Sequence, residues 1–172
     1  MAIGFFYSWR RVRLKAIPLA DLLSHGLMLA ALQFLCAYTA FPTAGRPWLA
    51  PCLFVFAISL YCQLFNQLRD LDGDRQAGVN HTAARIGPRA TYILMILLLV
   101  VGLALLVVSV WQRSIPLWVI GLAGGLSLAM LFVLMRRARL TKTAVGVPAT
   151  YNEPMALMAV VVMLVWLVVG TG

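Results

Sequence analysis

The chain has 172 residues, of which 63% are hydrophobic and 11% are charged, and its formal net charge is +9. Its mean hydropathy is +0.94. A soluble domain of this length has too small an interior to bury so much apolar surface, so the composition excludes a soluble globular protein. It indicates a protein whose solvent is the lipid bilayer.

Five hydrophobic stretches have lengths near that of a membrane-crossing helix. Because lipid offers the backbone no hydrogen-bond partners, only helices and closed barrels span a bilayer, and these stretches are too long and lack the alternation of barrel strands. The sequence therefore predicts an all-α, polytopic membrane protein with a single membrane domain over residues 1–172. The predicted spans are residues 22–41, 49–68, 91–111, 115–135 and 155–169.

The basic residues are divided unequally between the two sides of these spans. Only Arg46 and Arg113 fall on one side, and the other twelve of the fourteen fall on the opposite side. The positive-inside rule makes that richer side cytoplasmic, so the N-terminus is predicted to lie inside and the C-terminus outside. This pattern explains the net charge without nucleic acid. It predicts an integral protein of a bacterial-type inner membrane whose functional face, near all five acidic residues, is cytoplasmic.

A basic segment precedes the first predicted span. It reads Tyr7-Ser8-Trp9-Arg10-Arg11-Val12-Arg13-Leu14-Lys15. Arg13 and Lys15 are suited to hold phosphate oxygens through charge-assisted hydrogen bonds. The alternative is that these charges only set the topology or attract lipid headgroups, and composition alone favours that alternative.

The second predicted span is followed by most of the acidic residues. Asp70, Asp72 and Asp74 lie within five positions, whereas Asp21 and Glu153 lie far from any cluster. Carboxylates crowded at the end of an apolar segment repel one another, and a divalent cation is the obvious compensating charge.

The spacing of these acids suits a helix. If the second helix continues past residue 68, Asn66, Asp70 and Asp74 share one face at successive turns. Two carboxylates one turn apart can each give an oxygen to Mg²⁺, which fills the rest of its shell with water and phosphate oxygens. The spacing therefore favours a metal–diphosphate site.

The alternative for this acidic segment is a solvated helix end. Arg69 and Arg75 would then pair with Asp72 and Asp74 in surface ion pairs that stabilise little.

Two motifs together resemble those of a known family. The string Asn66-x-x-x-Asp70-x-x-x-Asp74, followed by Arg75-x-x-Gly78 and Thr82-Ala83-x-Arg85-Ile86-Gly87, resembles the second aspartate-rich motif of the UbiA superfamily of intramembrane prenyltransferases. The stretch from Tyr7-Ser8 to Arg13-Leu14-Lys15, with Pro18 and Asp21, is similar to the tyrosine-serine and arginine-leucine-lysine segment before the family's fifth helix. Both motifs occur in the family's order, and together they cover about half of the chain.

The resemblance implies an all-helical membrane fold with nine helices in the complete enzyme. It also implies Mg²⁺-dependent transfer of an isoprenoid chain from a prenyl diphosphate to a lipophilic, often aromatic, acceptor. By position, Asp70 and Asp74 are the expected catalytic residues and Mg²⁺ ligands, and Asn66 assists them. Arg13 and Lys15 are expected to contact the diphosphate. Metal and basic groups would stabilise the departing diphosphate, and an apolar cavity would shelter the allylic cation from water.

The chain departs from the family pattern in two places. Arg10 and Arg11 stand where related sequences usually have prolines. The family's first aspartate-rich motif, of the Asn-Asp-x-x-Asp-x-x-x-Asp kind, has no counterpart here, and the chain resembles helices five to nine. We therefore expect the C-terminal part of a prenyltransferase, either a fragment or a truncated protein, that is inactive alone. Activity would require a partner chain that supplies the missing N-terminal helices, or a longer true reading frame.

Another class of function stays open at this point. The chain can be a non-catalytic membrane protein that binds a prenyl diphosphate or a divalent cation, or that pairs with a full-length relative. A transporter is disfavoured, because the spans carry no chain of buried charges of the kind that proton relays use.

Overall fold

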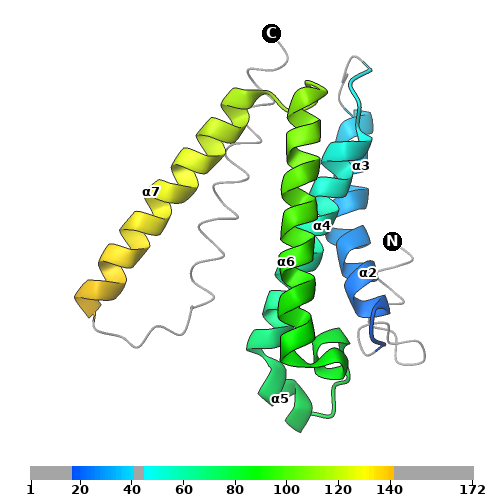
Figure 1. Cartoon of the computed structure of the whole chain (residues 1–172), viewed down its shortest axis with the longest axis vertical. Coiled ribbons are helices and arrows are strands. Elements are labelled where there is room, and N and C mark those ends of the chain that lie inside the picture. The colour runs from blue at the N-terminus through cyan, green and yellow to red at the C-terminus, as the bar shows by residue number, and fades with distance from the viewer. Residues whose placement is uncertain (1–16, 41–44, 142–172) are drawn as a thin grey trace. The chain divides into compact units, whose positions relative to one another are not determined.

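The structure is a computed structural model that describes residues 17–40 and 45–141. These residues form helices, and no strand occurs among them. Their contacts divide the chain into two units, Met1–Ser114 and Ile115–Gly172, each of which is described by itself. The helices are labelled in Figure 1.

The first unit contains three membrane-length helices and one short helix. The first long helix is continuous from Ala20 to Ala40 but contains a π-helical stretch, η2. The elements in chain order are α2 (Ala20–Gly26), η2 (Leu27–Ala31), α3 (Leu32–Ala40), α4 (Leu49–Arg69), α5 (Leu71–Gln76) and α6 (Thr82–Trp111).

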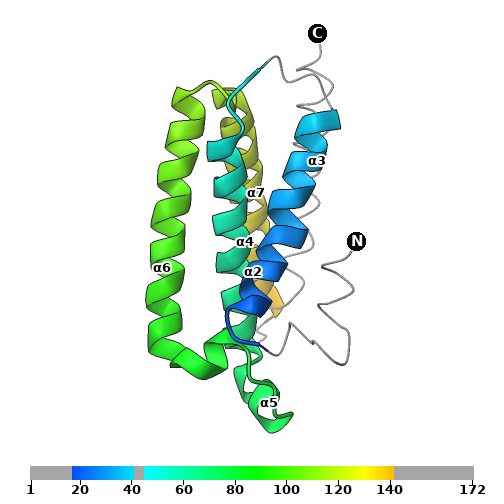
Figure 2. The same cartoon turned by 90° about the vertical axis from the view of Figure 1, so that its right-hand side faces the viewer.

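Helix α4 lies at the centre of this unit. It packs against α6 on one side and against α2 and η2 on the other (Figure 2). The core where these helices meet is formed by Leu22, Leu60, Leu64 and Met95. Gly26 allows the close approach of α2 to α4, because a Cβ atom there would lie 2.7 Å from side-chain atoms of Leu60 and Phe56.

The long helices confirm the all-α, polytopic fold class. Ala20–Ala40, Leu49–Arg69 and Thr82–Trp111 are each long and apolar enough to cross a membrane. The outer surface of α6 is strongly apolar, with exposed side chains such as Ile93, Ile96 and Val107. Such a surface is costly in water and natural in lipid.

The predicted third span, residues 91–111, lies within helix α6, but α6 extends further toward the N-terminus than the span. Helix α6 begins at Thr82, so part of the expected loop is helical. The sequence suggests a break because Gly87 and Pro88 interrupt the hydrophobic pattern, and α6 does kink there, since Gly87 has φ 82°. The residues before the kink are helical because Thr82 and Ala83 are buried and held by tertiary hydrogen bonds.

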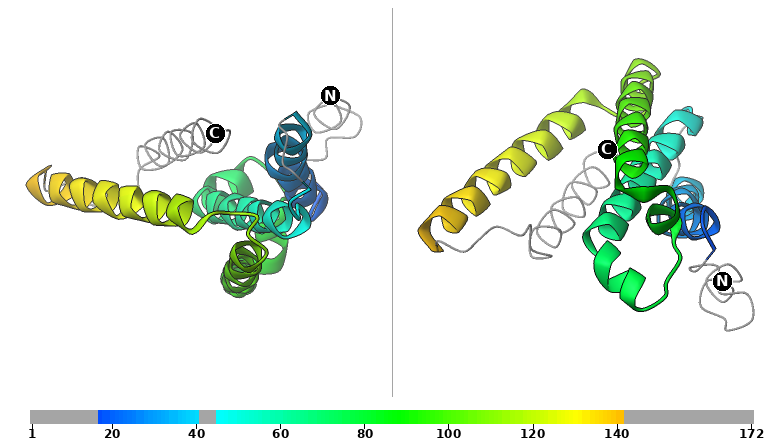
Figure 3. Two further views of the ribbon diagram at one scale, coloured as in Figure 1. Left: turned by 90° about the horizontal axis from the view of Figure 1, so that it is seen from above. Right: turned by 60° about the horizontal axis from the view of Figure 1, so that its bottom comes forward.

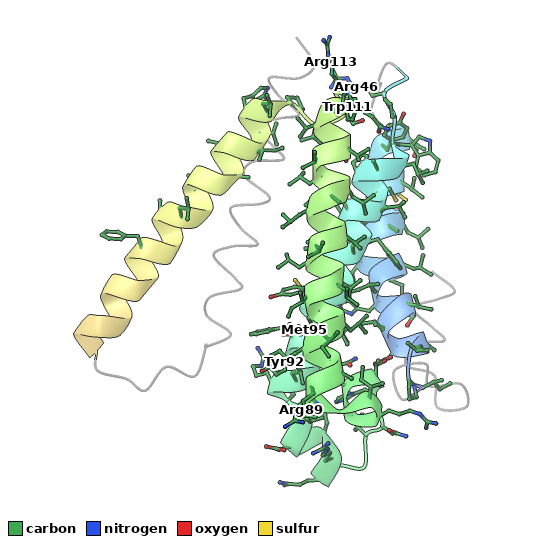
Figure 4. All side chains as sticks on the ribbon, viewed as in Figure 1. Arg46, Arg89, Tyr92, Met95, Trp111 and Arg113 are labelled. Atoms are coloured by element: carbon green, nitrogen blue, oxygen red, sulfur yellow. The ribbon has the colours of Figure 1, made fainter. Side chains whose placement is uncertain are left out.

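The two basic residues that the sequence sets apart from the others, Arg46 and Arg113, lie together at one end of this unit (Figure 4). Trp111 lies beside them, and Arg89 lies at the other end (Figure 4). Trp111 is 85% exposed, which suits a side chain at a membrane–water interface. Helix α5 and the turn after it form a loop at the Arg89 end, visible on the right of Figure 3.

The second unit is described only in part. Its helix α7 (Leu117–Thr141) contains most of the predicted span at residues 115–135. No charged residue lies between Leu117 and Met135, so the composition of this helix agrees with the predicted span, although no crossing is shown for it. The fourth span therefore stays a prediction, and the fifth, at residues 155–169, lies outside the described residues.

Candidate functional site

The acidic segment lies where α4 passes into α5. The helix bends at Asp70, which has φ −94° and ψ 4° and stands between the two helices. Helical hydrogen bonds continue through the bend, from Asp70 N to Asn66 O at 3.0 Å and from Asp74 N to Asp70 O at 2.9 Å. Asn66, Asp70 and Asp74 therefore occupy successive turns, although the helix does not continue straight.

Asp70 is paired with its neighbour in the chain. Arg69 Nε lies 3.0 Å from Asp70 Oδ1, and Arg69 Nη2 donates to Oδ2 at 3.2 Å. This hydrogen bond with Arg69 holds the pKa of the Asp70 carboxyl below its ordinary value. Both side chains are well exposed, at 38% and 53%, so the pair is weak and open to exchange. The alternative of a solvated helix end named Asp72 and Asp74 as the partners of the neighbouring arginines, but Arg69 pairs with Asp70 instead.

Asp74 faces a buried histidine. Asp74 Oδ2 lies 3.1 Å from His81 Nε2, and the His81 side chain is only 4% exposed. His81 Nδ1 accepts a hydrogen bond from Ala84 N at 3.1 Å and thereby caps α6. The Nε2 group is close to Asp74 but is not aligned with it as a hydrogen bond, and it has no other partner among the described residues.

Sequence reasoning missed His81. Helix caps of this kind are usually Ser, Thr, Asp or Asn, so a histidine before Thr82 gives little signal. Its proximity to Asp74 depends on the turn that separates α5 from α6, which only the fold shows.

Asn66 carries a buried oxygen without a partner. Its side-chain Oδ1 makes no hydrogen bond in the part of the chain that the structure describes. Buried polar atoms nearly always have a partner, so an unsatisfied oxygen calls for a ligand. The Asn66 amide oxygen, one turn before Asp70, is an oxygen ligand of the kind that hard cations bind.

The oxygen ligands in this region suit a cation site that substrate and water complete, and not one in which the protein supplies every ligand. Among the described residues, no three or more His, Cys, Asp or Glu side chains are grouped so that they can hold a metal. Two carboxylates and an amide oxygen match the way in which Mg²⁺ uses few protein ligands together with substrate phosphates. The donor chemistry of Asn66, Asp70 and Asp74 is therefore compatible with Mg²⁺ only if a phosphate ligand and water complete the shell.

A further acidic residue, Asp21, lies nearby, although it is distant in the sequence. Asp21 is 1% exposed. Its Oδ1 accepts from Thr82 Oγ1 at 2.6 Å, and its Oδ2 accepts from Gln67 Nε2 and from Thr82 N. Gln67 Oε1 in turn accepts from Ala83 N at 3.1 Å. This buried network, made by Asp21, Gln67 and Thr82, joins α2, α4 and the start of α6. Asp21 and Thr82 were noted as residues of the two motifs, but their contact was not predicted.

The remaining candidates cannot be placed. Arg13, Lys15 and Glu153 lie outside the described residues. Asp72, which the spacing puts off the shared face, is exposed on α5.

Comparison with known proteins decides the family. The sequence model of the UbiA prenyltransferase family matches residues 1–152. The chain belongs to the UbiA prenyltransferase family. This confirms the resemblance drawn from the two motifs, and membership supports a prenyltransferase-type function in an integral membrane protein.

A similar UbiA-type protein is a lycopene elongase/hydratase from Haloferax volcanii. The two are 33% identical over 97 residues, which cover 54% of this chain and 31% of that protein. The chain thus spans about a third of the length of this relative. No solved structure matches the chain.

Proposed function

We propose that this UbiA family chain carries one half of a Mg²⁺–diphosphate site and serves transfer of an isoprenoid chain from a prenyl diphosphate. The observation that carries the proposal is the placement of Asn66, Asp70 and Asp74 at successive turns, directly past an apolar membrane-length helix. The buried Asn66 Oδ1 has no hydrogen-bond partner among the described residues, so it is free to coordinate a cation. Prenyl diphosphates carry their charge at one end and an apolar chain at the other, which matches this junction.

Each residue has a defined part in this proposal. Asp70 and Asp74 hold Mg²⁺, and Asn66 supports them with its amide oxygen. Bound Mg²⁺ supplies positive charge that stabilises the departing diphosphate. To bind Mg²⁺, Asp70 would release its weak ion pair with Arg69. The Arg69 guanidinium could then donate hydrogen bonds to phosphate oxygens. Arg13 and Lys15 contact the diphosphate from the segment before α2.

The apolar helices complete the chemistry on the hydrocarbon side. Leaving-group departure exposes an allylic cation, which water would quench, and apolar surroundings exclude water. The relative named as a lycopene elongase/hydratase favours a lipophilic acceptor over a water-soluble one.

The second half of the site must come from further polypeptide. This chain has five acidic residues, and only Asp70, Asp72 and Asp74 are clustered. We therefore propose that carboxylates of an Asn-Asp-x-x-Asp-x-x-x-Asp motif reach the diphosphate from another segment or a partner chain. The chain alone is expected to bind cation and diphosphate weakly and to show little or no transfer.

Binding of Mn²⁺ with inorganic diphosphate tests the site directly. Electron paramagnetic resonance of the purified chain in lipid nanodiscs measures the bound Mn²⁺. Asp70→Asn and Asp74→Asn should each lower the affinity by at least about tenfold, because each removes a charged oxygen ligand. Asp72→Asn is the matched control on the same short helix and should bind as the unmodified chain does.

Equal binding by all three variants would contradict the proposed site. Binding that depends on Asp70 and Asp74 but never supports prenyl transfer, even with a chain that carries the first aspartate-rich motif, would favour the alternative of a non-catalytic diphosphate-binding protein.

A further inference from the structure

His81 contacts both the cap of α6 and the acidic segment. Its Nδ1 accepts from Ala84 N, so the neutral ring carries its proton on Nε2, the atom that lies 3.1 Å from Asp74 Oδ2. The ring is buried, and Nε2 has no aligned acceptor in the described part of the chain. A buried N–H group that lacks an aligned acceptor and lies against a carboxylate calls for a functional explanation.

The backbone under His81 is firmly held. The next residue, Thr82, is 1% exposed and donates to Asp21, and its hydroxyl accepts from Leu19 N at 2.8 Å. Ala83 N donates to Gln67 on α4. His81 therefore projects from a base that is tied to two other helices, so its ring has little freedom to move.

Helix α5, by contrast, has few anchors. It has six residues, and Leu71 is its one buried side chain. A helix of this length has marginal stability by itself. The chain leaves it through Gly78, whose φ of 68° favours glycine, and Val79 N donates to Asp74 O at 2.9 Å. Apart from these contacts, His81 is the described side chain that reaches the Asp74 carboxylate.

We propose that His81 is a positioning residue that orients the Asp74 carboxylate for the cation. This inference rests on the function proposed above. The buried network holds the backbone beside His81, and the His81 ring in turn holds Asp74 Oδ2, which would leave Oδ1 to the cation. Histidines and carboxylates behind metal ligands commonly act in this way, and their loss lowers metal affinity about 10- to 100-fold. The loose alignment in the free chain is of the kind that tightens when a ligand binds.

Two substitutions separate the two nitrogen atoms of His81. His81→Asn keeps an acceptor where Nδ1 lies and is a favoured helix cap, but it removes the Nε2 group. His81→Gln places an amide near the Nε2 position and loses the cap. If His81 only caps α6, His81→Gln should lower stability more than His81→Asn does. If His81 positions Asp74, His81→Asn should lower the cation affinity more than His81→Gln does.

The experiment measures Mn²⁺ binding with inorganic diphosphate by electron paramagnetic resonance, and thermal unfolding of the same samples. We expect His81→Asn to unfold near the midpoint of the unmodified chain while its Mn²⁺ affinity falls about tenfold. His81→Gln should unfold at a lower temperature and recover part of the affinity.

The outcomes distinguish this inference from the proposed function. If Asp74→Asn weakens binding and His81→Asn binds like the unmodified chain, the positioning role is wrong and the site stands. If Asp74→Asn itself binds like the unmodified chain, the site is wrong and His81 has no ligand to position. If His81→Asn lowers both the affinity and the unfolding midpoint, and His81→Gln restores no affinity, the role of His81 is structural only.

Discussion

Asp21 and Asp70 lie at the same end of the first unit and behave in opposite ways. Asp21 is 1% exposed, and protein donors occupy both of its oxygens. The Asp70 side chain is 53% exposed, and within residues 17–40 and 45–141 its one ionic partner is Arg69 beside it. A carboxylate taken out of water must find its donors in the protein, while an exposed one keeps water and can exchange it for a ligand.

This difference changes how acids in a membrane protein are interpreted. An ionisable residue near a membrane helix is usually taken as functional. Here the isolated acid, Asp21, has every sign of a structural role, because it ties three helices together. The clustered acids remain available to a ligand. The partners of each carboxylate, and not its position near the membrane, separate the two roles.

Substitution of Asp21 should have the largest effect on stability. Asp21→Ala removes three hydrogen bonds and leaves buried donors on Gln67 and Thr82 without acceptors. We expect the free energy of unfolding to fall by about 3 kcal/mol or more, measured by chemical unfolding in mixed micelles. Asp72→Ala, on the exposed part of α5, is the control and should change little. Unfolding of Asp21→Ala like the control would show that Asp21 is not structural.

A smaller effect is expected at Thr82. Thr82→Val keeps the shape but removes the hydroxyl that donates to Asp21 and accepts from Leu19 N. Gln67 still donates to Asp21, so the loss should be about 1 to 3 kcal/mol in the same measurement. Thr39→Val is a matched control, because the Thr39 hydroxyl is exposed and bonds only carbonyls of its own helix. A Thr82 variant as stable as the Thr39 variant contradicts the network.

The smallest effect is expected at Arg69. The hydrogen bond from Arg69 lowers the pKa of Asp70, so the pair stabilises the fold above the ordinary carboxylate pKa, and this contribution is lost as the pH falls through the lowered value. Arg69→Gln should raise the pKa of Asp70 toward its ordinary value, which carbon-13 NMR of the aspartate carboxyl groups measures. The unfolding midpoint at neutral pH should scarcely change, because the pair is exposed. An unchanged pKa would show that Arg69 does not hold Asp70 in solution.

Much of the fold could be predicted from the sequence because it follows from local properties. Long apolar runs in lipid have to be helical, so the three long helices of the first unit were expected nearly where they lie. The spacing of Asn66, Asp70 and Asp74 predicted successive turns, and the hydrogen bonds show them there. Whether these residues bind a cation stays a prediction.

Three features were not foreseen from the sequence. The hydrophobic pattern identifies lipid-facing residues, and it says nothing of the bend at Asp70 or of the helical residues from Thr82 that precede the span. His81 was missed because the turn after α5 brings it to Asp74. Only the start of α6 depends on residues that are distant in the chain, namely Asp21 and Gln67.

The sequence by itself determined that the protein is helical, lies in a membrane and carries its acids at one end, since hydropathy and helical period are properties of neighbouring residues. Only the tertiary structure decided which acid is structural and which is open to a ligand. That distinction depends on burial and on hydrogen-bond donors from other helices, as when Gln67 and Thr82 reach Asp21 across 46 and 61 positions of the chain.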